Sequence, residues 1–235
     1  MIGSEAFKTF AKRVQLNNEL FFDPNEPMWF GRAPGRLDVM GGIADYSGSL
    51  VLEMPIAEAT FTAVQVNNSP DINIISFRNG RSQPPAQFAM PLATLHTHPT
   101  AKQAATFFKQ TSDSSWAAYI AGALWLLKRE KGISFPKGLN ILVDSSVPEG
   151  KGVSSSAAVE VATMQALSQS LNLALMPTEL AILCQQVENE IADAPCGIMD
   201  QMTVVNGRKN KLLALLCQPA TILGQVTIPS DLAFW

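Results

Sequence analysis

A stretch rich in glycine and serine in the middle of the chain has the composition of a phosphate-binding loop. It reads PEGKGVSSSA over residues 148–157, between a predicted strand that ends near Val143 and a predicted helix that begins near Ser155. Glycines let the backbone approach a ligand closely, N–H groups at a helix start attract an anion, and serine hydroxyls can bind phosphate or magnesium. Lys151 lies between the glycines, so the spacing is not that of a Walker motif, and a flexible turn capped by a serine accounts for the same residues.

A second segment places one arginine and two aspartates among four glycines. It reads APGRLDVMGGIADYSG over residues 33–48 and is flanked by predicted strands. A carboxylate can accept hydrogen bonds from two hydroxyls of a polyol, and Arg36 can orient a neighbouring carboxylate by bidentate pairing. The segment is therefore a candidate sugar site, with a pair of tight turns bearing surface caps as the alternative.

A third segment, residues 188–201, carries two carboxylates beside apolar positions. Glu188 follows Cys184 by four residues on a predicted helix, which places it at the edge of the buried face and makes it a candidate ligand. Asp200 follows a Pro-Cys-Gly turn and has apolar neighbours, which would partly desolvate it. The alternatives are a solvated helix residue for Glu188 and a helix N-terminal carboxylate for Asp200.

The elements that must position these segments are typical of an α+β fold, because strands come first and helices mostly follow without strict alternation. We expect an antiparallel sheet early in the chain and a loop over residues 78–100. The predicted strands are Met28 to Ala33, Leu50 to Ile56, Thr60 to Val66, Ile72 to Phe77, Leu139 to Val143, Leu212 to Leu216 and Ile222 to Ile228. The predicted helices cover residues 5–20, Trp116 to Lys131, Ser155 to Leu171 and Pro177 to Ala192.

Composition excludes several classes of function. The 235 residues are 47% hydrophobic with a net charge of −3, and the basic residues are scattered, which disfavours nucleic acid and anionic membranes as partners. The longest apolar stretch, Trp116 to Leu127, is shorter than the roughly 20 residues of a membrane-spanning helix. The lack of a visible signal segment and three cysteines without CxxC spacing predict a cytoplasmic protein. His96 and His98 have no third ligand nearby, so a metal role is disfavoured.

Taken together and in this order, the three segments resemble the conserved blocks of the GHMP kinases, in the galactokinase and L-arabinokinase branch. The string PCGIMDQ over residues 195–201 is the most specific and is similar to the segment that holds the catalytic aspartate. The block from Gly35 to Gly48 looks like the galactokinase sugar signature, but Gly42 and Ile43 stand where galactokinases carry a Glu-His pair. That variant resembles the L-arabinokinases. The resemblance covers about residues 28–230.

The resemblance implies a fold and a set of site residues. Residues 1–235 would form the N-terminal domain, similar to ribosomal protein S5 domain 2, with the C-terminal domain absent. Asp200 would be the catalytic carboxylate near the anomeric hydroxyl, as a full base or as an orienting group, and Arg36 would pair with it and hold it ionised. By the same match, Asp45, Tyr46 and Gly197 would bind the sugar; Gly150, Gly152, Ser154, Ser155 and Ser156 the nucleotide phosphates; and Ser156 and Glu188 magnesium.

The implied activity is that of a sugar 1-kinase with ATP and Mg²⁺ as cofactors and a monosaccharide as substrate, L-arabinose ahead of galactose. The missing half is the expected protein partner, and the isolated chain would be weakly active or inactive. One alternative is a sugar and ATP sensor of the galactokinase type without useful catalysis. Another is a different branch of the superfamily, such as a glucuronate or mevalonate kinase. Trp116 and Tyr119 are expected in the core rather than against adenine, with the alternative that Trp116, at the start of its helix, flanks the base.

Overall fold

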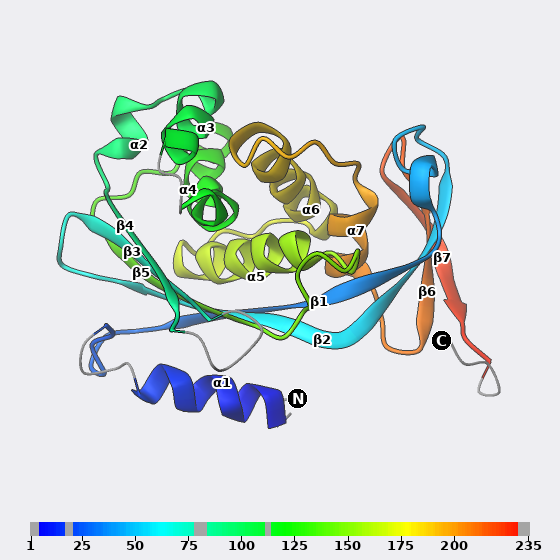
Figure 1. The fold of residues 1–235 in the computed structure, drawn as a ribbon, viewed down its shortest axis with the longest axis horizontal. Helices are drawn as coiled ribbons and strands as arrows, with labels where there is room; N and C mark the ends of the chain where they lie inside the picture. The colour runs from blue at the N-terminus through cyan, green and yellow to red at the C-terminus, as the bar shows by residue number, and fades with distance from the viewer. Residues whose placement is uncertain (1–4, 17–20, 78–83, 111–113, 230–235) are drawn as a thin grey trace.

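A curved mixed sheet carries most of the helices on one face and a single N-terminal helix on the other (Figure 1). The computed structural model describes residues 5–16, 21–77, 84–110 and 114–229. The α+β class is confirmed, with α1 (Glu5–Leu16) packed against the sheet face opposite to α5 (Ser155–Ser170). Within the described residues, no helix is long and apolar enough to span a membrane.

The described residues form seven strands in the order β4-β3-β5-β2-β6-β7, with β1 paired to β2. The first four are β1 (Trp29–Met40), β2 (Leu50–Val66), β3 (Asp71–Phe77) and β4 (Ala86–Pro91). The remaining three are β5 (Leu139–Ser145), β6 (Lys211–Leu216) and β7 (Thr221–Thr227). The sheet is antiparallel as predicted, except that β3 and β5 run parallel because a long helical crossover joins them.

The helices on the main face form a packed layer over the sheet. They are α2 (Thr94–Thr97), α3 (Ala101–Gln110), α4 (Ala118–Lys131), α5, α6 (Pro177–Gln186) and α7 (Met199–Asn206), with a π-helical turn at Val187–Ile191 directly after α6. Two helix boundaries lie where single residues predicted them. Gly132 ends α4 in the left-handed conformation, and Pro177 opens α6.

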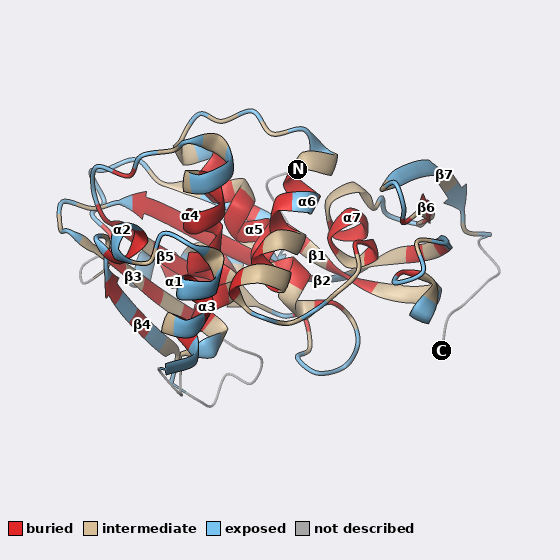
Figure 2. Cartoon of the chain, turned by 90° about the horizontal axis from the view of Figure 1, so that it is seen from above, coloured by how far each residue is buried: buried red, intermediate tan, exposed pale blue. Residues whose placement is uncertain are grey.

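The core lies between α5 and the long strands β1 and β2, with α4 packed beside α5. Both helices are buried around most of their circumference, which fits their weakly amphipathic sequences (Figure 2). Gly31 of β1 faces α5 so closely that a Cβ added to it would overlap the carbonyl oxygen of Ala162. On the opposite face, Phe10 of α1 stacks on Phe61 with ring centroids 5.3 Å apart.

Several predicted elements were wrong in extent. The two segments predicted from Leu50 to Val66 form one strand, β2, which pairs with β6 through its first part and with β5 through its last part, so its burial pattern changes along its length. The predicted loop over 78–100 contains β4 and α2; its residues 78–83 lie outside the described residues. Helix α3 was not predicted. The helix predicted to run to Ala192 ends at Gln186 and continues as the π-helical turn.

Candidate functional site

The carboxylate of Asp200 meets the serine-rich loop and Arg36 at the first turn of α7. Arg36, in β1, donates from Nε to Asp200 Oδ1 at 2.9 Å and from Nη2 to the same oxygen at 2.5 Å. Ser154 Oγ donates to Asp200 Oδ2 at 2.6 Å, and Arg36 Nη1 donates to the carbonyl of Gly152 at 2.8 Å. Both carboxylate oxygens are therefore held, and the arginine joins the predicted catalytic helix to the predicted phosphate loop.

Ser154 reaches Asp200 because its backbone is left-handed. Its φ of 57° places it just before α5 in a conformation that is unusual for a residue with a side chain. The hydroxyl is donated to Asp200, so in this structure the side chain links the loop to the carboxylate, and the predicted contact of Ser154 with a nucleotide phosphate stays a prediction. Ser154 therefore ties the loop to the Asp200 carboxylate.

Two substitutions at position 154 separate backbone strain from the lost hydrogen bond. Both Ser154→Gly and Ser154→Ala remove the hydroxyl, but glycine adopts a positive φ without steric cost. We expect the glycine variant to be more stable than the alanine variant by about 1 kcal/mol, measured by urea unfolding. Equal free energies of unfolding would contradict a strained backbone at this position.

The glycines of the predicted phosphate loop leave open space above the backbone. Gly150 and Gly152 have φ of 67° and 66°, and no described atom lies within 4 Å of a Cβ added to either of them. Ser155 and Ser156 follow in the first turn of α5, where N–H groups point out of the helix. The loop therefore has the open, N–H-rich geometry that suits an anion.

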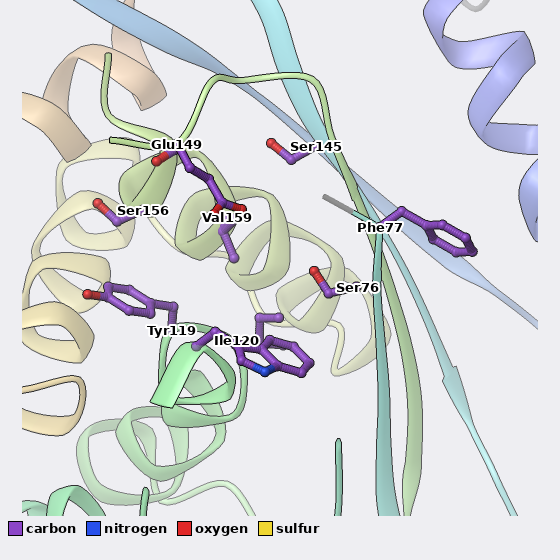
Figure 3. A pocket seen from close by; sticks show the side chains of 10 residues that line it. Ser76, Phe77, Tyr119, Ile120, Ser145, Glu149, Ser156 and Val159 are labelled. Atoms are coloured by element: carbon purple, nitrogen blue, oxygen red, sulfur yellow. The ribbon is translucent and has the colours of Figure 1, made fainter. Parts of the chain in front are cut away.

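A pocket of about 220 Å³ opens beside this loop, between α5, the start of α4 and the ends of β3 and β5 (Figure 3). Ser155, Ser156 and Glu149 line its loop side, and Ser76 and Ser145 line its strand side. Trp116 and Tyr119 also line the pocket, and both are partly buried; Trp116 packs against the core, as expected, and borders the pocket as well. Trp116 precedes α4 in a 3₁₀ turn, so its ring is only partly covered.

Glu188 is a buried carboxylate close to the same loop. It lies in the π-helical turn, where the widened backbone follows α6, and its Oε2 accepts a hydrogen bond from Gln201 Nε2 at 2.7 Å. Burial raises the pKa of Glu188, Asp200's charge raises it further, and a hydrogen bond from Ser156 lowers it.

This carboxylate and the Ser156 hydroxyl fit magnesium. A buried acid that faces a second carboxylate is stabilised by a cation, and hard oxygen donors are those that Mg²⁺ prefers. In the described part of the chain, no three His, Cys, Asp or Glu side chains form a metal cluster. A serine, a glutamate and bound phosphates would therefore supply the ligands together.

Sequence reasoning missed two polar residues behind the site. Gln201 is fully buried and donates through Nε2 to Glu188 Oε2 and to Glu160 Oε2, the latter at 3.2 Å. Glu160 is buried on α5, and burial raises its pKa well above the ordinary value. These side chains tie α5, the π-helical turn and α7 together. The sequence offered one signal for each residue: Gln201 directly follows Asp200, and Glu160 lies four residues after Ser156.

The predicted sugar residues meet at the N-terminus of α7. Asp45 is 5% exposed, and its Oδ1 accepts from the backbone N–H groups of Ile198 and Met199 at 2.9 and 3.2 Å. A Cβ added to Gly197 would overlap the Asp45 carboxylate, and Tyr46 donates its hydroxyl to the Pro195 carbonyl at 3.4 Å. The loop that joins β1 to β2 is thus fastened to the helix that carries Asp200.

Family comparisons match the parts of the chain that build this site. The model of the GHMP kinases N terminal domain matches residues 118–208, and the galactokinase galactose-binding signature matches residues 18–66. The two ranges cover more than half of the chain and include Arg36, Ser154 and Asp200. The chain carries the N-terminal domain of a GHMP kinase of the galactokinase family. The predicted family is confirmed.

This GHMP kinase domain is similar in sequence to an L-arabinokinase and to galactokinases. L-arabinokinase from Arabidopsis thaliana is 47% identical over 91% of the chain and 23% of its own length. Galactokinase from Pyrococcus furiosus is 30% identical over 78% of the chain and 46% of its own length. Galactokinase from Lactococcus lactis, solved with galactose, matches with a TM-score of 0.77 at 22% identity over 94% of the chain and 52% of that protein. The chain thus spans about a quarter to a half of these proteins.

Proposed function

We propose that this domain belongs to an ATP-dependent sugar 1-kinase, which transfers the γ-phosphoryl group of ATP to the anomeric hydroxyl of a monosaccharide. The observation that carries the proposal is the Asp200 carboxylate, held by Arg36 and Ser154 at the edge of an open glycine loop. Phosphoryl transfer needs positioning, charge neutralisation and an acceptor for the hydroxyl proton. In this proposal the loop and Arg36 would position the groups, bound Mg²⁺ would neutralise charge, and Asp200 would accept the proton.

The residues divide the work between two sides of the loop. Gly150, Gly152 and the first turn of α5 would hold the phosphates, and the pocket beside Trp116 and Tyr119 would take the nucleotide base. Ser156 and Glu188 would hold magnesium. When bound, Mg²⁺ supplies positive charge that neutralises the phosphate oxygens. Asp200 would orient the sugar hydroxyl and accept its proton, while Arg36 keeps the carboxylate in place.

We predict that L-arabinose has a higher kcat/KM than galactose. Galactose carries an exocyclic hydroxymethyl group that a pentopyranose lacks, and this chain has Gly42 and Ile43 where galactokinases have Glu-His. Ile43 is 81% exposed, so it presents an apolar wall instead of two polar partners. The double variant Gly42→Glu, Ile43→His should shift the ratio of the two kcat/KM values towards galactose, measured by ADP release. A higher kcat/KM for galactose in the unmodified sequence would contradict the prediction.

ADP release with and without sugar tests the function itself. Because the chain spans about a quarter to a half of its relatives, the assay compares the chain alone with the chain joined to the C-terminal region of a relative. We expect sugar-dependent ADP release that is greater in the joined protein. Binding of both ATP and sugar without ADP release in either protein would overturn the kinase proposal in favour of a sensor.

A further inference from the structure

Glu53 is a buried acid directly behind the proposed catalytic pair. It lies in β2, is 0% exposed, and is paired with Asp38 of β1 on one side and with Leu213 of β6 on the other. Within the part of the chain that the structure describes, neither of its oxygens accepts a hydrogen bond from a donor. A carboxylate that is ionised, buried and without donors is costly, whereas a protonated carboxylic acid in the same place is far less so.

Arg36 does not relieve this cost through hydrogen bonds. Its Nε lies 3.2 Å from Glu53 Oε2, but Nε and Nη2 each donate a hydrogen bond to Asp200, and Nη1 donates one to Gly152. Glu53 therefore feels the positive charge without receiving a proton donor. The hydrogen bonds from Nε and Nη2 of Arg36 are thus made to Asp200.

Asp38 supplies the acceptor that a protonated Glu53 needs. A Cβ added to Gly41 would lie 2.8 Å from both Asp38 Oδ1 and Glu53 Oε1, so both oxygens lie beside Gly41, and the Asp38 and Glu53 side chains are hydrogen-bond partners. Two carboxyl groups can share a hydrogen bond when one of them keeps a proton. The pKa of Glu53 is raised to about 9 in total: burial raises it most, the Arg36 charge lowers it, and the charge and hydrogen bond of Asp38 and the charge of Asp200 raise it.

The second oxygen of Asp38 holds the loop between β1 and β2. Asp38 Oδ2 accepts from the backbone N–H of Gly42 at 2.6 Å, and Gly42 begins the 3₁₀ turn that leads to Asp45. With φ of 56°, Gly42 also has the left-handed backbone that the turn requires. Glu53, Asp38 and Gly42 thus form a chain from the core to the proposed sugar loop.

We propose that Glu53 is a positioning residue that acts as a neutral acid: it donates its proton to Asp38, which in turn fixes the sugar loop at Gly42. The part that concerns sugar rests on the kinase function proposed above. The charged and titratable groups around Glu53 are Arg36 and Asp38 on β1, Asp200 on α7 and Cys217 after β6. Glu53→Gln is the informative variant, because an amide donates to Asp38 without a titrating proton.

The first test is the pH dependence of unfolding, which needs no kinase activity. Between pH 4.5, the ordinary pKa, and about 9, native Glu53 keeps a proton that the unfolded chain has lost. Wild-type stability must therefore fall with rising pH relative to Glu53→Gln, and the ratio of their unfolding constants should change by up to about tenfold for each pH unit. The exposed Glu58→Gln on the same strand is the control and should track the wild type. A pH-independent ratio between wild type and Glu53→Gln would overturn the proposal.

The second test asks whether the proton positions the loop. At pH 7, the Gly42 amide should exchange with solvent at the wild-type rate in Glu53→Gln and at least tenfold faster in Glu53→Leu, which cannot donate to Asp38. Unchanged exchange in Glu53→Leu would overturn the positioning role. In the kinase assay, Glu53→Leu should raise the KM for sugar about tenfold and leave the KM for ATP unchanged. The two proposals can fail separately. If neither the wild type nor the variants release ADP, but unfolding and Gly42 exchange behave as expected, the kinase proposal is wrong and the role of Glu53 in positioning the loop is supported.

Discussion

Replacing Asp200 by asparagine is expected to lower kcat for sugar phosphorylation by about 10²- to 10⁴-fold, the range typical of a lost acid–base group. Asparagine keeps the size of the side chain, and its carbonyl oxygen can still accept from Arg36 or Ser154. It cannot take a proton from a hydroxyl. The change therefore isolates the chemistry of the carboxylate from its place in the structure, and ADP release at saturating ATP and sugar measures it.

A matched control for Asp200→Asn lies a few residues upstream. Asp193 is about half exposed and pairs with Lys109 on the surface, so Asp193→Asn should leave kcat unchanged. If Asp200→Asn raised the KM for sugar and kept kcat, Asp200 would be a binding group alone, and the catalytic assignment would be wrong. A loss of kcat with unchanged nucleotide affinity supports it.

Replacing Gly31 by alanine is expected to lower the free energy of unfolding by about 3 kcal/mol or more, at the upper end of what overpacking costs. The added Cβ would overlap the carbonyl oxygen of Ala162, and α5 would have to move away from β1. Backbone atoms of a buried helix cannot turn aside as a flexible side chain can. Since α5 begins at the loop proposed to bind phosphate, the shift should also weaken nucleotide binding. Urea unfolding and ATP titration measure the two effects.

Gly224 provides the control for Gly31. It also lies in a strand, β7, and no described atom lies within 4 Å of a Cβ added there. Gly224→Ala should be neutral or slightly stabilising, because alanine loses less backbone entropy on folding. If Gly31→Ala were as stable as Gly224→Ala, α5 would not approach β1 as closely as the structure has it.

The parts of the fold that the sequence predicted correctly are those with local signals. Gly132 and Pro177 mark a helix end and a helix start through their own backbone preferences, and the α+β class follows from the order of the elements. The strand β2 was predicted as two pieces because it has different neighbours at its two ends, and neighbours are set by the whole chain. The parallel pairing of β3 with β5 is likewise a property of the crossover between them.

The site was predictable to the extent that its motifs resemble those of a known family. The pairing of Arg36 with Asp200 joins residues 164 positions apart, and no local pattern shows it. Glu53 and Gln201 were missed because a single polar residue in an apolar segment usually points to solvent. Here each is fully buried against other polar groups. The direction of the Ser154 hydroxyl depends on one left-handed residue, which sequence patterns do not specify.

The cap that Asp45 places on α7 has a consequence for how such domains diversify. One carboxylate belongs to the loop between β1 and β2, yet it anchors a helix that begins more than 150 residues later. If the loop were moved into a protein with a larger residue at the position of Gly197, the side chain there would overlap the aspartate. Chimeras should therefore exchange residues 41–48 and 195–201 as a set. Residues 41–48 and 195–201 thus form one structural unit, although they are far apart in the sequence.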